Sequence, residues 1–133
     1  MLHSLVRMRS VIVTGVLLAL GAAPAWAGDA RPQVVAAEAV PGAARSVGLT
    51  VTGRDRDGVV RGLEVEWGDG GAQGMSTCEL PTRPRKGRKE TFELGYAYAA
   101  PGAYTIRVRV LSGGCGKRKQ QRSAARTVTV QIP

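Results

Sequence analysis

Apolar and polar residues alternate along several segments of the chain, so that each segment has one apolar face and one polar face. The alternation is clearest over residues 47–51, 63–67, 104–110 and 128–132. Successive side chains of a β-strand point to opposite faces of its sheet, and this period therefore predicts half-buried antiparallel strands. Residues 33–40 and 90–94 show a weaker form of the pattern. No window keeps the period of a helix over a helix length.

Turn signals separate the alternating segments. They are Pro41-Gly42, Asp57-Gly58, Asp69-Gly70-Gly71, Pro101-Gly102 and Gly113-Gly114. Glycine, proline and aspartate favour the backbone angles of tight turns. Short strands with such turns between them are typical of β-sandwiches and barrels. The expected fold class is therefore all-β, and 133 residues suit one domain.

The N-terminal segment has the pattern of a secretory signal peptide. Arg7 and Arg9 precede an apolar stretch over residues 11–23, and Ala25-Trp26-Ala27 matches an A-x-A cleavage site. An uncleaved anchor is the alternative, although the stretch is shorter than the roughly 20 residues of a membrane-spanning helix. We therefore expect a cleaved signal over residues 1–27 and a β-domain over residues 28–133. The mature protein would be secreted, extracellular or bound to the cell wall, without a transmembrane segment.

Cleavage changes the charge and the chemistry that the chain offers. The whole chain has 19 Lys and Arg against 10 Asp and Glu, a net charge of +9. Two of these cations lie in the signal peptide, so 17 remain against 10 anions and the charge becomes +7. The one histidine, His3, leaves as well. Its loss excludes Ser-His-Asp and Cys-His catalysis and His-ligated zinc. We expect no enzymatic activity, no cofactor and no metal.

Two motifs resemble the signatures of PKD domains. Val65-Glu66-Trp67-Gly68-Asp69-Gly70 resembles W-D-F-G-D-G, and residues 96–106, YAYAAPGAYTI, resemble H-x-Y-x-x-P-G-x-Y-x-V. Asp55-Arg56-Asp57-Gly58 matches the D-x-D-G loop of the family. The resemblance runs from about Val34 to Ile132. It implies an immunoglobulin-like antiparallel β-sandwich of about seven strands, acting as an extracellular binding or spacer module without enzymatic activity of its own.

The resemblance also assigns structural roles to individual positions. These positions are Trp67, Gly68, Asp69, Gly70, Tyr98, Pro101, Gly102 and Tyr104. The Asp69 carboxylate is expected to accept hydrogen bonds from backbone amides in a tight turn. Tyr104 is expected to act as a corner residue, with its ring inside and its hydroxyl bonded to the backbone. Asp55 and Asp57 resemble the start of a calcium loop, but the other ligands are missing and a turn is predicted instead.

Two cysteines, Cys78 and Cys115, form an even pair in a chain expected to be exported, which predicts a disulfide. Each cysteine precedes a basic loop. Because bonded cysteines have Cα atoms roughly 5.5–6 Å apart, a disulfide would root both loops at one end of the sandwich. The cations of this expected patch are Arg83, Arg85, Lys86, Arg88, Lys89, Lys117, Arg118, Lys119 and Arg122.

The basic loops support one functional hypothesis and leave others open. They are suited to bind an anionic cell-wall or extracellular polymer, although charge runs are most often solvated loops without a ligand. They contain no aromatic residue for base stacking, so specific nucleic-acid binding is not expected. A structural domain that docks an extracellular protein through a strand face or edge is the alternative. Glu64 and Glu66 share one strand face, but such exposed pairs seldom serve as hydrolase carboxylates.

Overall fold

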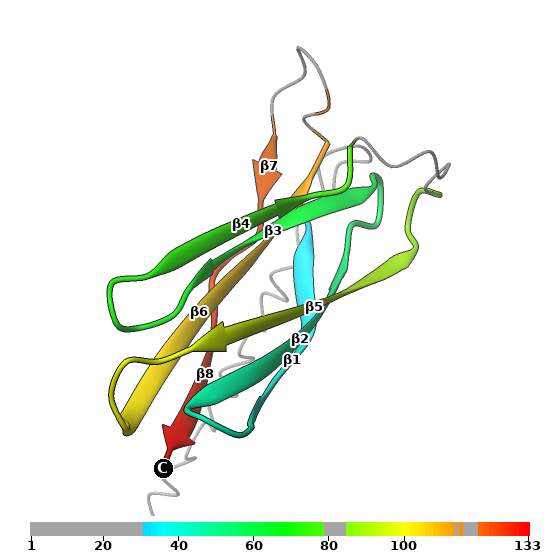
Figure 1. Cartoon of the computed structure of the whole chain (residues 1–133). Coiled ribbons are helices and arrows are strands. Elements are labelled where there is room, and N and C mark those ends of the chain that lie inside the picture. The colour runs from blue at the N-terminus through cyan, green and yellow to red at the C-terminus, as the bar shows by residue number, and fades with distance from the viewer. Residues whose placement is uncertain (1–30, 79–84, 114, 116–119) are drawn as a thin grey trace, which may run out of the picture.

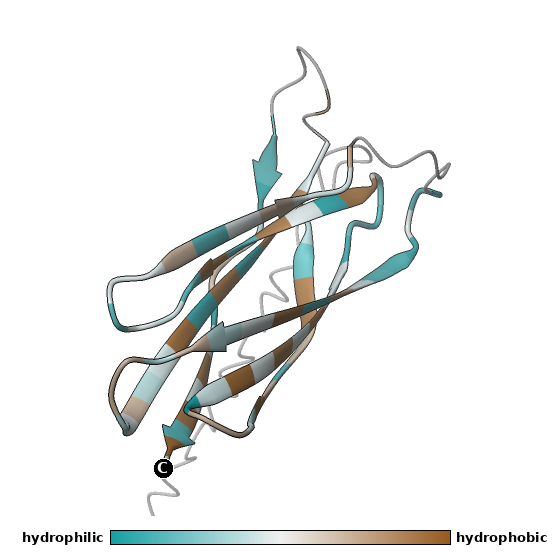
Figure 2. Ribbon diagram, in the orientation of Figure 1, coloured by the Kyte–Doolittle hydropathy of each residue, from teal (hydrophilic) through white to brown (hydrophobic). Residues whose placement is uncertain are grey.

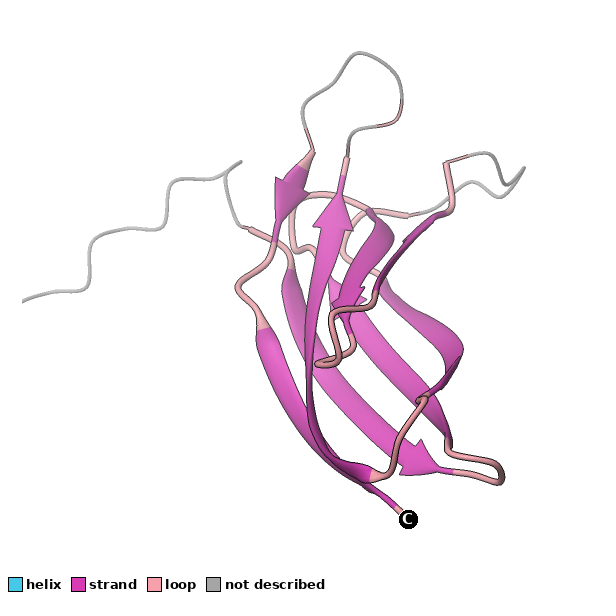
Figure 3. Cartoon of the chain, turned by 60° about the vertical axis from the view of Figure 1, so that its left-hand side comes forward, coloured by secondary structure: helices cyan, strands magenta, loops and turns pink. Residues whose placement is uncertain are grey.

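The computed structural model describes residues 31–78, 85–113, 115 and 120–133, and this part of the chain forms strands and no helix (Figures 1 and 3). The strands are β1 (Gln33–Pro41), β2 (Ser46–Arg54), β3 (Val60–Glu66), β4 (Ala72–Ser76), β5 (Lys89–Ala97), β6 (Gly102–Ser112), β7 (Gln121–Arg122) and β8 (Arg126–Ile132). The expected signal peptide, residues 1–27, lies outside the described residues. Within the described part, no helix is long and apolar enough to cross a membrane.

The strands pair into two antiparallel sheets that face each other as a sandwich. One sheet has the order β1-β2-β5, and the other has β4-β3-β6 followed by β7 and β8. β7 pairs with the last two residues of β6, Leu111 and Ser112, and β8 pairs with β6 from Gly102 to Val108. β7 and β8 therefore follow one edge and act as a single interrupted strand. Counted this way, the fold is the expected immunoglobulin-like sandwich of seven strands.

The interruption between β7 and β8 is closed by Ser123. Its amide donates to the carbonyl of Val110 at 2.9 Å, and the amide of Val110 donates to the Ser123 hydroxyl at 2.9 Å. That hydroxyl in turn donates to the carbonyl of Ala124 at 2.8 Å. Ser123 is buried, where an unpaired amide would be costly. The serine side chain thus replaces a backbone partner where the ladder breaks.

The hydrophobic core lies between the two sheets and comes largely from the predicted alternating positions (Figure 2). The buried members of the four clearest segments are Val47, Leu49, Val51, Leu63, Val65, Trp67, Ile106, Val108, Val110, Val130 and Ile132. Tyr104 and Val128 of the same pattern are only half-buried. β4 was not predicted, because its sequence AQGMS has no run of apolar residues. It forms because β3 offers a free edge with which β4 pairs.

The turn between β1 and β2 differs from the expectation that Gly42 supplies its unusual backbone angle. The left-handed residues are Ala44 and Arg45, with φ of 52° and 59°. For a residue with a side chain, this conformation is unfavourable by about 1–2 kcal/mol. Here the carbonyl of Arg45 accepts a hydrogen bond from the amide of Tyr98 at 2.9 Å, and the Arg45 guanidinium donates to the carbonyl of Ala99. These bonds hold the strained turn against the connection between β5 and β6.

Candidate functional site

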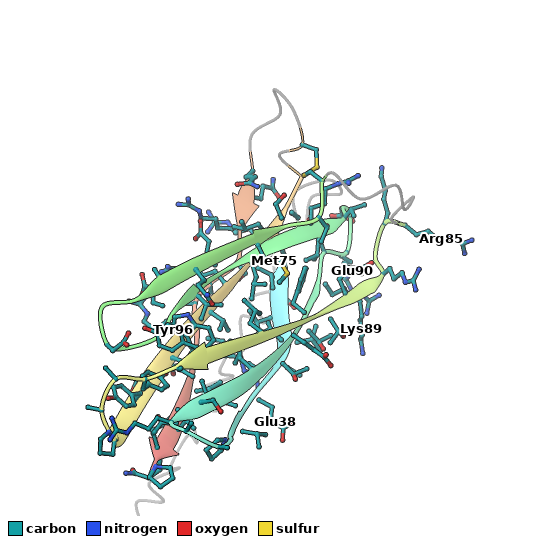
Figure 4. All side chains as sticks on the ribbon, in the orientation of Figure 1. Glu38, Met75, Arg85, Lys89, Glu90 and Tyr96 are labelled. Carbon is teal, nitrogen blue, oxygen red and sulfur yellow. A yellow bond between two sulfur atoms is a disulfide. The ribbon has the colours of Figure 1, made fainter. Side chains whose placement is uncertain are left out.

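A disulfide joins the two sequence regions that carry the basic loops. Cys78 and Cys115 are bonded, with their Cα atoms 5.6 Å apart, which confirms the predicted pairing. Cys78 follows β4 and Cys115 follows β6, and both strands pair with β3 in the antiparallel sense. Their C-terminal ends therefore lie at the same end of the sandwich, where the bond is drawn in yellow in Figure 4. Both basic loops begin at this end, which we call the disulfide end.

The first basic loop is fastened to the connection between β2 and β3. Gly87 has a φ of 75° and donates its amide to the carbonyl of Gly58 at 3.0 Å. The Nε of Arg54, the last residue of β2, donates to the carbonyl of Gly87 at 2.9 Å. These two bonds hold the loop in place where it enters β5.

The predicted cations of the first loop that the structure describes are Arg85, Lys86, Arg88 and Lys89. All four are exposed, and none makes an ion pair with another described residue. Figure 4 shows Arg85 and Lys89 projecting away from the sheets. Arg83 of the same loop lies outside the described residues.

The second basic loop is described only at its end. Lys117, Arg118 and Lys119 lie outside the described residues. Arg122 lies on β7, and its Nη2 is 3.1 Å from the Glu64 carboxylate across the outer face of the sheet. Arg122 therefore shares its charge with a carboxylate, unlike the described cations of the first loop.

The carboxylates considered for hydrolysis are paired with arginines. Glu64 contacts Arg122, and the carboxylate of Glu66 lies 3.6 Å from the guanidinium of Arg107. These pairs lie on the partly exposed outer face of the second sheet, where ion pairs contribute at most about 1 kcal/mol. The arrangement is that of a solvated strand face whose carboxylates are paired with arginines.

The Asp55–Gly58 segment forms a turn in which the Asp55 side chain accepts a backbone hydrogen bond. The Asp55 carboxylate is buried and accepts the amide of Asp57 at 3.1 Å. Within the described ranges, no group of three or more His, Cys, Asp or Glu side chains is placed to hold a metal ion.

Four aromatic side chains gather at the end of the sandwich opposite the disulfide. Trp67 stacks on Tyr96 with ring centroids 4.6 Å apart, Tyr96 meets Tyr98 edge-on at 5.0 Å, and Tyr98 stacks on Tyr104 at 3.9 Å. The hydroxyl of Tyr98 donates to the carbonyl of Trp67 at 2.8 Å, and that of Tyr104 donates to the carbonyl of Ala100 at 2.7 Å. Tyr104 thus bonds the backbone as the corner role requires, but Tyr98 is the more deeply buried tyrosine.

Asp69 organises the turn that follows β3. Its carboxylate accepts the amide of Gly71 at 2.8 Å and the hydroxyl of Tyr96 at 2.6 Å. The hydrogen bond from Tyr96, followed by that from Gly71, lowers the pKa of Asp69, and the same bond to Asp69 raises the pKa of Tyr96. Gly68 and Gly70 adopt φ of 89° and 93°, which residues with side chains rarely do. Gly68, Asp69 and Gly70 of the motif therefore shape this turn.

Alkaline pH provides a test of how deeply Tyr98 is buried. Burial, with a smaller effect from the Asp69 charge, raises the pKa of Tyr98 from 10.0 to about 12. A raised pKa in the folded state gives stability that is complete below pH 10 and is lost as the pH rises through 12. Stability is therefore expected to fall by about 1 kcal/mol between pH 9 and pH 11 through this group alone.

The measurement compares urea unfolding of the natural protein and of Tyr98→Phe at both pH values. The difference between the two slopes isolates Tyr98, since the other titrating groups are shared. In the folded protein, the tyrosinate absorbance near 295 nm should also show a late phase near pH 12 that Tyr98→Phe lacks. Equal pH slopes for the two proteins would contradict the assignment.

Sequence reasoning did not single out three arginines near the first basic loop. Arg31, Arg54 and Arg56, together with Gln33, line a cleft of about 320 Å³. Arg31 is distant from the other two in the chain, and Arg54 and Arg56 alternate with Asp55 and Asp57, so the three form no run of like charge. The available signal was that Arg54 ends an alternating strand on its polar face. Only the pairing of β1 with β2 brings Gln33 opposite Arg54.

Comparison with known proteins supports the fold. No protein-family model matches the chain. No curated protein matches it either. Among solved structures, it is similar to the PKD domain of an M14-like peptidase from Thermoplasmatales archaeon SCGC AB-540-F20, with a TM-score of 0.51 and 17% identity. The match covers 77% of this chain and 96% of that domain. The chain therefore has a PKD-like, immunoglobulin-like fold, as the two motifs predict.

Proposed function

We propose that the protein is a secreted, non-catalytic binding module that docks to an anionic extracellular or cell-wall polymer through its two basic loops. The observation that carries this proposal is the exposed run Arg85, Lys86, Arg88 and Lys89 at the disulfide end, without ion pairs to other described residues. Figure 2 shows hydrophilic residues over β7 and over the start of β5 at this end. Clustered cations attract polyanions over a distance that falls as salt increases.

The fold and the disulfide support such a role. Loops at the end of a rigid sandwich are common binding surfaces, because the sheets hold their roots in place. Disulfides are typical of proteins that fold in oxidising compartments, which agrees with the signal-peptide pattern of residues 1–27. The pairing of Glu64 and Glu66 with arginines supports a module without hydrolytic chemistry.

Matched charge variants test the proposal. Arg85→Gln/Arg88→Gln removes two exposed cations from the first loop, whereas Arg107→Gln/Arg109→Gln removes two from the outer face of β6. Both variants lower the net charge equally. On an immobilised heparin column, we expect the loop variant to elute at a clearly lower salt concentration than the natural protein. The β6 variant should elute close to the natural protein, because its cations lie outside the loops.

Equal shifts for both variants would mean that only net charge matters, and the proposed surface would then be wrong. Unchanged retention of both would also overturn it. The same comparison with Lys117→Gln/Lys119→Gln tests the second loop, whose charges the proposal also uses.

A second candidate function is docking of an extracellular protein through an exposed sheet edge. It is favoured by β4, a short edge strand with no charged residue and mostly exposed side chains. Free backbone groups on such an edge can pair with a strand of a partner. Binding that persists unchanged at high salt, and that a proline at Gly74 abolishes, would favour this candidate over the basic loops.

A further inference from the structure

A cleft beside the first basic loop concentrates positive charge without using that loop's own cations. Among the residues that the structure describes, Arg31, Gln33, Arg54 and Arg56 line it, and its volume is about 320 Å³. Three of these four side chains are guanidinium groups, and all four residues are exposed. No carboxylate of a described residue lines the cleft.

Strand pairing explains why residues distant in sequence meet here. Gln33 begins β1 and lies opposite Arg54, which ends β2. Arg54 in turn lies opposite Lys89, which begins β5. Arg31 comes just before β1 and Arg56 just after β2, so both extend the same end of the three-stranded sheet. The sheet therefore sets the spacing of the cluster.

The central arginine is held in place but keeps free donors. Arg54 donates from Nε to the carbonyl of Gly87 at 2.9 Å, which restrains the side chain. A guanidinium has five N–H donors, and this bond uses one. Its two terminal nitrogens can therefore still donate hydrogen bonds to an anion. An arginine that is already restrained loses less entropy on binding.

Asp55, the carboxylate between Arg54 and Arg56 in the chain, is not among the described residues that line the cleft. The Asp55 carboxylate is buried and bonded to the amide of Asp57. A Cβ placed on Gly58 would lie 2.6 Å from the Asp55 oxygen, so the carboxylate packs against its own turn. Arg31, Arg54 and Arg56 make no ion pair with another described residue.

From these observations we propose that the cleft binds a single phosphate group. A phosphate offers several acceptor oxygens and up to two negative charges, and arginine forks bind it bidentately. A carboxylate has only two oxygens and one charge, which one guanidinium can satisfy. The volume also suits one phosphate group together with part of the molecule that carries it. This site consists of residues outside the run of cations in the basic loops. The proposal therefore does not depend on whether those loops bind a polymer.

The test is a titration of isotope-labelled protein with inorganic phosphate, followed by NMR in chloride buffer at fixed ionic strength. We expect saturable shifts of the Arg54 side-chain Nε–H and of backbone amides near Gln33 and Arg56. Arg31→Gln/Arg56→Gln should weaken binding at least about tenfold, because two guanidinium groups that can donate charged hydrogen bonds to the phosphate are lost. Arg54→Lys, which keeps the charge but loses the fork, should also weaken it.

Controls separate a site from general charge. Arg107→Gln, on the outer face of the other sheet, should bind phosphate as the natural protein does. Glycerol phosphate tests the source of the group: tighter binding than inorganic phosphate indicates an esterified phosphate, and weaker binding indicates the free ion. Unsaturated shifts spread over all cationic residues would overturn the proposal, as would equal binding of acetate.

The loop variant Arg85→Gln/Arg88→Gln makes failure of this inference distinguishable from failure of the proposed function. It should keep phosphate binding while it elutes from heparin at a clearly lower salt concentration. Heparin retention without saturable phosphate binding would overturn the cleft alone. Thermal unfolding of each variant checks that the fold persists, and the conservative Arg54→Lys variant provides a test if the double variant does not fold.

Discussion

Replacing Trp67 with alanine is expected to lower the free energy of unfolding by about 3–5 kcal/mol. The side chain is 0% exposed, stacks on Tyr96 and donates from Nε1 to the Gln73 side chain at 3.1 Å. Removing the indole ring leaves a cavity between the sheets and removes the partner of Tyr96. Small domains are stable by only about 5–15 kcal/mol, so the variant should lose a large fraction of its stability.

Trp67→Phe provides the matched control. It keeps an aromatic ring against Tyr96 and loses the hydrogen bond to Gln73, an exposed residue that water can satisfy. We expect a cost clearly smaller than that of Trp67→Ala. Urea unfolding followed by far-UV circular dichroism measures both variants without relying on tryptophan fluorescence. We expect Trp67→Ala to lower the free energy of unfolding by at least about 3 kcal/mol. A loss of less than about 1 kcal/mol would contradict the role of Trp67 in stabilising the core.

Removing the disulfide is expected to have a comparable effect. The bond joins cysteines 37 positions apart. In the chain-entropy model, closing a loop of this length stabilises the folded state by about 4 kcal/mol, because it restricts the unfolded chain. Cys78→Ser/Cys115→Ser should therefore unfold at a much lower urea concentration than the oxidised protein.

The natural protein under reducing conditions is the control for this prediction. It should unfold at nearly the same urea concentration as the double variant, because both lack the cross-link. The double variant itself should be insensitive to the reductant. Equal stabilities of the oxidised and reduced natural protein would contradict the expected contribution of the Cys78–Cys115 bond.

Alternation predicted most of the strands because half-buried strands need one apolar face. Val47, Leu49 and Val51 illustrate this, since all three face the core. The same reasoning could not find β4, whose small and polar residues form a strand only because β3 has a free edge. It also could not assign the left-handed angles to Ala44 and Arg45, which depend on bonds to the distant Tyr98–Ala99 segment.

In the candidate site, too, some features could be predicted from the sequence and others could not. The basic loops are visible in the sequence because their cations are consecutive or nearly so. The arginine cleft is not, because Arg31 and Arg54 become neighbours only through the register of β1 with β2. For Arg122 the tertiary structure removes a residue from the expected patch instead of adding one. Arg122 belongs to the second basic segment in sequence, but on β7 its guanidinium pairs with the Glu64 carboxylate.

The sequence by itself determined the all-β class, most of the positions that form the core, the cysteine pair and the PKD-like motifs. These features depend on local alternation, on turn residues and on an even cysteine count. The tertiary structure alone decided the pairing of the edge strands, the closure at Ser123 and the arginine cleft. Each of these depends on which strands lie side by side and in what register, and contacts across a sheet leave no periodic trace in the chain.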